Sequence, residues 1–209
     1  QTSVAPITAA AANTAQATLS IVIPPASTTS SSSRGTEYVS PSTGSVSFQL
    51  PSMANPTVVA VGPNVSGCTG TVGTGYTCTA SFSAPLGASQ VLTVKTYANS
   101  TGTGSVLAQG TTTISVTATG PNSAIGTLNG VVASIALSSS GGTTVTVGTP
   151  GTTTITWSAK DASGNTIIAP GTLIDATGAA LATPSPSISP SADSSAFSNG
   201  RYSGTATGG

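Results

Sequence analysis

The sequence predicts an all-β chain that folds as two β-sandwich modules in tandem. Three observations predict this fold class. Apolar and polar residues alternate with a period of two in segment after segment, clusters of Gly, Pro, Asn and Ser separate these segments, and no stretch of useful length shows the 3.6-residue period of an amphipathic helix. Strands that recur at a spacing of about 8–12 residues are typical of a sandwich.

The candidate strands follow one another along most of the chain. In "TLSIVIP" the side chains of Leu19, Ile21 and Ile23 fall on one face, because successive residues of a strand point to opposite faces. "SVSFQLP" repeats this alternation with Val46, Phe48 and Leu50. The same pattern returns in residues 57–61, 76–82, 91–98, 112–119, 131–137, 143–147 and 152–160.

The alternation also predicts which side chains form the core of each module. The first core is expected to contain Leu19, Ile21, Val46, Phe48, Phe82, Leu92, Val94, Ile114 and Val116. The second is expected to contain Ile135, Leu137, Val145, Ile155 and Trp157. Trp157 shares its face with Ile155 and Ala159, so core packing is favoured over stacking on a sugar.

Composition divides the chain into four parts. Residues 1–16 form an uncharged, alanine-rich tail, residues 17–119 hold enough strands for one complete sandwich, and residues 120–130 read as a linker. The second module, residues 131–209, is one or more strands short. Its pattern fades into "TPSPSISPSADSS", where proline cannot donate a hydrogen bond to a β-ladder.

The two cysteines, Cys68 and Cys78, are separated by nine residues that include three glycines. This spacing is too wide and too flexible for a redox Cys-x-x-Cys site or a zinc knuckle, so a structural disulfide is expected. Two free, half-buried thiols are the alternative. Disulfides persist outside the reducing cytosol, and the chain begins at Gln1, which suits a mature product after signal-peptide removal. We therefore expect a protein exported to the cell surface or beyond.

Charge is scarce throughout the chain. Only 4% of residues are charged, against about 25% in an ordinary globular domain, while 37% are hydrophobic. The net charge of zero removes the repulsion that keeps protein surfaces apart, which favours self-association. The four basic residues are scattered singly, which excludes a nucleic-acid interface. The sequence contains no run of about 18 apolar residues, so no membrane-spanning helix is predicted.

The sequence offers little for catalysis, and neither an enzyme nor a cofactor is predicted. Without histidine, Ser-His-Asp and Cys-His arrangements are excluded. A Ser-x-x-Lys motif would need serine where Leu92 and Trp157 stand. Glycosidases need two facing carboxylates, but the four acidic residues are far apart in sequence: Glu37, Asp161, Asp175 and Asp193.

Two weaker signals concern ligands and modification. Asp161 and Asn165 offer oxygen atoms to calcium, but a five-residue stretch supplies too few ligands, and a hairpin turn around Gly164 is favoured. No metal site is therefore predicted. Asn64 and Asn99 each begin a formal N-glycosylation sequon, for which chance occurrence is the leading explanation.

Residues 131–167, "VVASIALSSSGGTTVTVGTPGTTTITWSAKDASGNTI", resemble the bacterial immunoglobulin-like repeats of invasins, intimins and related surface proteins. Units of that family often carry a strand that ends near an Asp-x-x-Gly-Asn turn, here Asp161, Gly164 and Asn165. The resemblance covers about a fifth of the chain. It implies a β-sandwich on a bacterial surface and does not transfer a ligand. The first module matches the family only in its strand pattern, and we expect both modules to be immunoglobulin-like sandwiches.

Three functions fit a secreted sandwich protein with so few reactive side chains. The first is the subunit of a self-assembling filament, in which roughly residues 1–23 of one copy complete the sandwich of the next. Candidate donor residues are Val4, Ile7, Leu19, Ile21 and Ile23. The second function is a stalk module of an adhesin, and the third is a carbohydrate-binding accessory domain. The expected partners are copies of the same chain, with host or environmental surfaces or glycans as further candidates.

Overall fold

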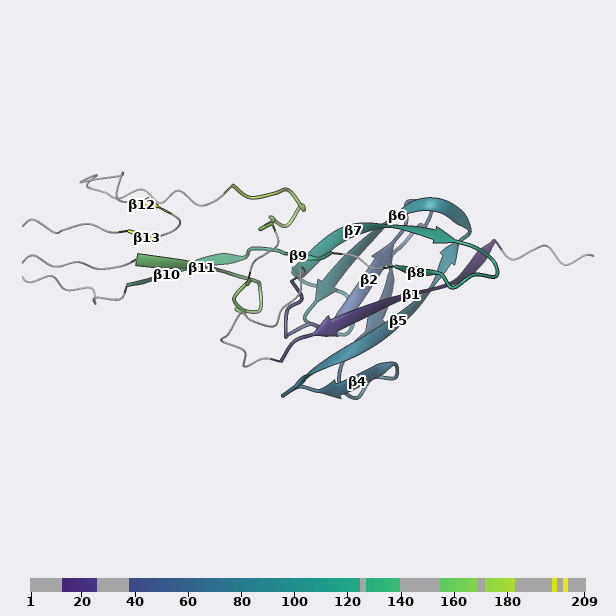
Figure 1. Cartoon of the computed structure of the whole chain (residues 1–209), viewed down its shortest axis with the longest axis horizontal. Helices are drawn as coiled ribbons and strands as arrows, with labels where there is room; N and C mark the ends of the chain where they lie inside the picture. Colours follow the sequence, from purple (N-terminus) through teal and green to yellow (C-terminus); the bar gives the residue numbers. More distant parts are fainter. Residues whose placement is uncertain are drawn as a thin grey trace, which may run out of the picture.

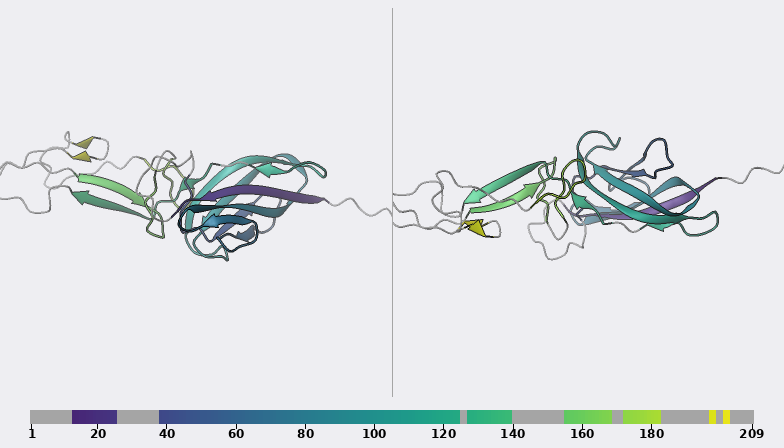
Figure 2. Two further views of the ribbon diagram at one scale, coloured as in Figure 1. Left: turned by 60° about the horizontal axis from the view of Figure 1, so that its bottom comes forward. Right: turned by 90° about the horizontal axis from the view of Figure 1, so that it is seen from above.

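The computed structural model describes residues 13–25, 38–124, 127–139, 155–168, 172–182, 197–198 and 201–202. Within these residues the chain is all-β, as predicted, and its strands lie in three sheets (Figure 1). Two of the sheets pack face to face, and the third extends from them towards one end of the molecule (Figure 2).

The first sheet of the sandwich has the strand order β4-β5-β1-β8. β1 pairs antiparallel with β5 along its whole length and parallel with the two residues of β8. The strands of this sheet are β1 (Thr14–Ile23), β4 (Cys68–Thr71), β5 (Gly75–Pro85) and β8 (Ser123–Ala124).

The second sheet has the order β3-β2-β6-β7-β9, and all of its neighbouring strands are antiparallel. β6 and β7 form a long hairpin at its centre. The strands are β2 (Ser45–Gln49), β3 (Thr57–Ala60), β6 (Gly87–Tyr97), β7 (Val106–Val116) and β9 (Asn129–Gly130).

The period-two pattern places the core between these two sheets. In β1 the odd-numbered residues from Ala17 to Ile23 are buried, and in β5 the even-numbered residues from Tyr76 to Ala84 are buried. Phe48 of one sheet stacks on Phe82 of the other, with ring centroids 4.4 Å apart. All nine residues predicted for the first core are buried, so that prediction is confirmed.

The third sheet has the order β10-β11-β13-β12, with the strands β10 (Ser134–Ser139), β11 (Ile155–Lys160), β12 (Phe197–Ser198) and β13 (Arg201–Tyr202).

The predicted second core is wrong for two of its members: Ile135 is 49% exposed and Leu137 is 68% exposed. No second described sheet covers their face of the hairpin. Val145 and the side chain of Ile155 lie outside the described residues.

Trp157 and Ala159 of β11 are covered by the sandwich instead, since both belong to the same apolar cluster as its core. The chain following β9 adds to this contact. Val131 donates its N–H to the carbonyl of Leu107 at 3.0 Å and forms a parallel bridge with Ile174. The described part of the second module therefore shares the core of the first.

Two predicted boundaries differ from the structure. β1 begins at Thr14, so residues 14–16 belong to the sandwich and not to the tail. The predicted linker, residues 120–130, supplies β8 to one sheet and β9 to the other, and buries Ala124 and Leu128 between them. Two-residue strands are too short to show an alternation, which is why the sequence pattern missed them.

The structure also narrows the list of candidate donor residues. Leu19, Ile21 and Ile23 pair with β5 of their own chain and fill its core, so they are not available to another copy in this fold. β1 is a central strand of its own sheet, so the candidate donors that this fold leaves unassigned are Val4 and Ile7. Val4 and Ile7 lie outside the described residues.

Candidate functional site

The cysteines form a disulfide in the hairpin of β4 and β5. Cys68 and Cys78 are register partners, with Cα atoms 4.0 Å apart and an S–S distance of 1.99 Å. Cys78 is buried in the core, and the Cys68 sulfur accepts a weak hydrogen bond from the Gly62 N–H at 3.5 Å. The bond ties the short edge strand β4 to the sandwich, and it leaves no free thiol in the chain.

Two of the four acidic residues lie in the described part of the chain, and each closes a turn of the same design. The turns are Asp161-Ala162-Ser163-Gly164 and Asp175-Ala176-Thr177-Gly178, a short repeat that the sequence analysis did not detect. The structural role is shared as well, because each glycine has a positive φ, 81° for Gly164 and 92° for Gly178. Glu37 and Asp193 lie outside the described residues.

The carboxylates hold these turns through main-chain N–H groups. Asp161 Oδ1 accepts hydrogen bonds from the N–H groups of Ser163 at 2.9 Å and Asn165 at 3.0 Å. Asp175 Oδ1 accepts from Thr177 at 2.8 Å and Ala179 at 3.0 Å. Both acids therefore stabilise turns, the role favoured over calcium for Asp161. No group of three or more potential metal ligands occurs within the described ranges.

The first turn also joins distant parts of the chain. Tyr38 Oη donates to Asp161 Oδ2 at 2.8 Å, and Asn165 Nδ2 donates to the hydroxyl oxygens of Ser40 at 3.1 Å and Ser42 at 2.9 Å. Tyr38 and Asp161 are both buried. We call these five residues the polar joint. It connects the segment before β2 to the turn after β11 and is a structural network.

Two described groups have shifted pKa values. The Thr177 hydroxyl and then the Ala179 N–H hold the pKa of Asp175 below its ordinary value of 3.8. Burial raises the pKa of Tyr76, whose hydroxyl donates to the carbonyl of Thr43 at 3.1 Å. Both shifts favour the protonation state that each group already has at neutral pH. Neither group is thereby prepared to transfer protons.

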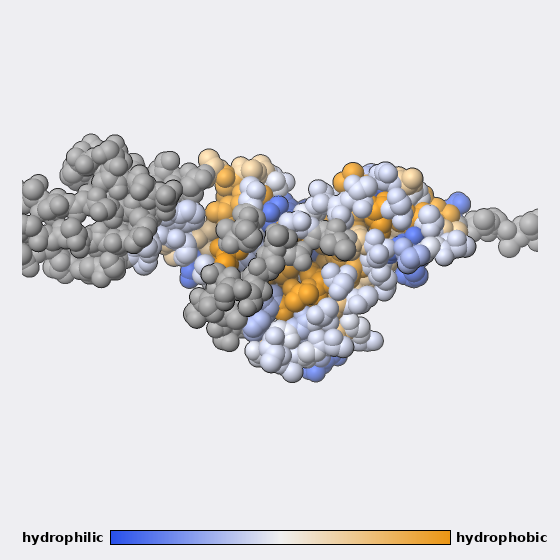
Figure 3. Space-filling model, in the orientation of Figure 1, coloured by the Kyte–Doolittle hydropathy of each residue, from blue (hydrophilic) through white to orange (hydrophobic). Residues whose placement is uncertain are grey.

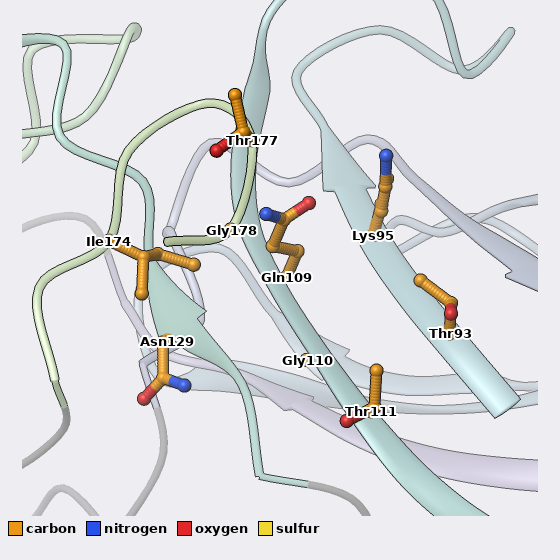
Figure 4. A pocket seen from close by; sticks show the side chains of 9 residues that line it. All are labelled: Thr93, Lys95, Gln109, Gly110, Thr111, Asn129, Ile174, Thr177 and Gly178. Atoms are coloured by element: carbon orange, nitrogen blue, oxygen red, sulfur yellow. The ribbon is translucent and has the colours of Figure 1, made fainter. Parts of the chain in front are cut away.

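A shallow cleft of about 370 Å³ lies beside the second turn (Figure 4). Lys95 of β6, Gln109 of β7 and Thr177 of the turn are among the residues that line it. Its described lining residues carry hydroxyl, amide and ammonium groups, and none of them is a carboxylate or a thiol. Figure 3 shows one face of the molecule, where pale, weakly polar residues surround several orange patches of hydrophobic residues.

Asn64 and Asn99, the two sequon asparagines, are both exposed. Asn99 is engaged within its own turn, because its Oδ1 accepts hydrogen bonds from the N–H groups of Thr101 at 3.2 Å and Thr103 at 3.1 Å. Its amide therefore has a structural role whether or not it is modified.

Comparison of the chain with protein-family models, with curated proteins and with solved structures found no match. Among the described residues, no helix is long and apolar enough to span a membrane.

Proposed function

We propose that this protein is a non-enzymatic, extracellular structural protein, the subunit of a pilus-like surface filament built by β-strand donation between copies. The observation that carries the proposal is the placement of two elements. The start of β1 lies at one end of the long axis, and the apolar hairpin of β10 and β11 lies towards the other (Figures 1 and 2). A donor and an acceptor at opposite ends produce head-to-tail assembly.

The chemistry of the described side chains supports a structural role. Both cysteines are bonded to each other, and Asp161 and Asp175 hold turns. A disulfide of this kind is favoured in an oxidising compartment, which supports export from the cell. The scarcity of charge supports contact between copies.

The strand order supports an immunoglobulin-like first module. In an immunoglobulin sandwich the sheets run A-B-E-D and G-F-C-C′. Here β1, β5 and β4 correspond to B, E and D, while β7, β6, β2 and β3 correspond to G, F, C and C′. The position of strand A is occupied by β8, which runs parallel to β1 and follows β7 in the sequence.

Negative-stain imaging of the purified chain, before and after deletion of residues 1–12, tests the proposal. We expect filaments from the full chain and folded monomers from the deletion variant, which keeps β1 intact. Filaments from the deletion variant would exclude donation by the N-terminal segment. Monomers of the full chain at every concentration would favour an adhesin stalk module instead.

A further inference from the structure

We propose that the acceptor of the donated segment is the free edge of β10, and that residues 5–11 of a second copy pair with it so that Ile7 packs beside Leu137. This inference rests on the proposed filament and names its contact. We call the surface formed by Ile135, Leu137 and their register partners Ala159 and Trp157 the hairpin face.

The hairpin face is apolar but only half covered. Ala159 and Trp157 pack against the sandwich core, whereas Ile135 and Leu137 on the neighbouring strand are exposed. The opposite face of the hairpin is polar, with the hydroxyl oxygens of Ser138 and Thr156 2.6 Å apart. Ile135 and Leu137 lie two positions apart on one face of β10, so a strand added beside β10 would cover part of both side chains.

Among the described residues, β10 also has one edge that pairs with no other strand. In the described sheet it pairs with β11 on one side and is the outermost strand on the other. An outermost strand presents main-chain N–H and C=O groups that can pair with another chain. A strand added here would hydrogen-bond to β10 and extend the hairpin face by one row of side chains.

The N-terminal segment fits this edge in charge, length and pattern. Residues 1–12 carry no charge, and they are twice as many as the six residues of β10. On an extended strand Ala5, Ile7, Ala9 and Ala11 share one face, and all four are apolar. Pro6 lacks an N–H group and is tolerated on an edge strand when its nitrogen points to solvent.

The segment that pairs with β10 comes from a second copy, because the N-terminal segment of the same chain is attached to the sandwich far from β10. Residues 1–12 enter β1 at Thr14, at the end of the sandwich far from β10 and β11 (Figure 1). β1 then runs along the sandwich towards the hairpin. The start of β1, to which the donor segment is attached, and the proposed acceptor strand therefore lie towards opposite ends of the long axis, which is the arrangement of an open head-to-tail contact.

Disulfide trapping tests the contact in the full chain. We expect the double variant Ile7→Cys with Leu137→Cys to form a ladder of cross-linked multimers on non-reducing gels, since the native cysteines are already paired. The matched control, Val4→Cys with Leu137→Cys, places its thiol on the other face of the donor and is expected to cross-link far less. A cross-linked monomer would show that the chain covers its own hairpin and would overturn the inference.

Charge substitution separates this inference from the proposed function. Leu137→Asp is expected to fold normally and to abolish elongation, while Val91→Asp, at a residue 50% exposed on β6, is expected to form filaments. Mixing Leu137→Asp with Ile7→Asp is expected to give dimers, because one variant retains a working donor and the other a working acceptor. Normal filaments from Leu137→Asp would overturn the acceptor assignment alone, whereas absence of filaments from the unmodified chain would overturn both proposals.

Discussion

Tyr38 and Asp161 are 123 positions apart in the chain and are joined by a 2.8 Å hydrogen bond between two buried side chains. This bond attaches the turn after β11 to the sandwich, and through that turn it fixes one end of the hairpin that we propose as the acceptor.

Replacing Tyr38 by phenylalanine is expected to lower the free energy of unfolding by about 1–3 kcal/mol, because the buried Asp161 carboxylate loses a hydrogen-bond donor. Urea unfolding measures the change. Tyr97→Phe, at a partly buried tyrosine of β6, is the matched control and is expected to have a smaller effect. Equal effects of the two substitutions would contradict a special role for the Tyr38 hydroxyl.

Replacing Phe48 by alanine is expected to cost about 3–5 kcal/mol, since it empties the centre of the core and removes the stacking partner of Phe82. Thermal or denaturant unfolding measures the loss. Val58→Ala on the neighbouring strand β3 serves as control, because that side chain is 37% exposed. A near-neutral Phe48 variant would mean that the two sheets do not pack as described.

Replacing Gly110 by alanine is expected to destabilise the fold by about 1–3 kcal/mol, because a Cβ atom there would collide with the Thr127 carbonyl oxygen of the segment between β8 and β9. Gly73→Ala adds the same methyl group where the structure has open space. That control is expected to stay within about 0.5 kcal/mol of the unmodified chain. Similar stability of both variants would argue against close packing of this segment on β7.

Replacing both cysteines by serine is expected to lower stability by about 2.8 kcal/mol, the chain-entropy value for an eleven-residue loop. Guanidinium unfolding of the variant and of the unmodified chain measures the difference. If the cysteine variant proved as stable as the native protein, the loop of β4 would have to be ordered by other contacts.

The turn at Asp175 is expected to weaken in acid. Because hydrogen bonds from Thr177 and Ala179 hold its pKa below 3.8, ionised Asp175 stabilises the turn fully above that ordinary pKa, and the effect is lost as the pH falls through the lower folded value. Asp175→Asn should therefore be less stable than the native chain at neutral pH and should approach it in strong acid. A pH-independent difference between the two proteins would exclude this origin.

The sequence was informative wherever a strand was long enough to show its period. Phe48, Phe82 and Leu92 were assigned correctly to a common core because alternation fixes which side chains share a face. Alternation does not show what covers that face. Ile135 and Leu137 show the same pattern, but they are exposed because the described chain places no second sheet over them.

The candidate site was harder to predict for two reasons. The proposed acceptor is the outer edge of β10, and the local sequence pattern does not show which strands pair with β10. The polar joint depends on contacts such as Tyr38 to Asp161, which appear only when the fold is complete. One signal was available in the sequence. The repeated Asp-Ala-Ser/Thr-Gly segments predict two equivalent turns in the second part of the chain.

The return of residues 121–130 to the sandwich has a consequence for the order in which the protein folds. The core that begins with Ala17 is closed by Ala124 and Leu128, so it remains open until more than a hundred further residues have left the ribosome. Sandwiches dominated by such distant pairings fold slowly, in about milliseconds to seconds. A chain cut at residue 119 should expose the interior of its two sheets, and quality-control proteases should remove it in preference to the full-length protein.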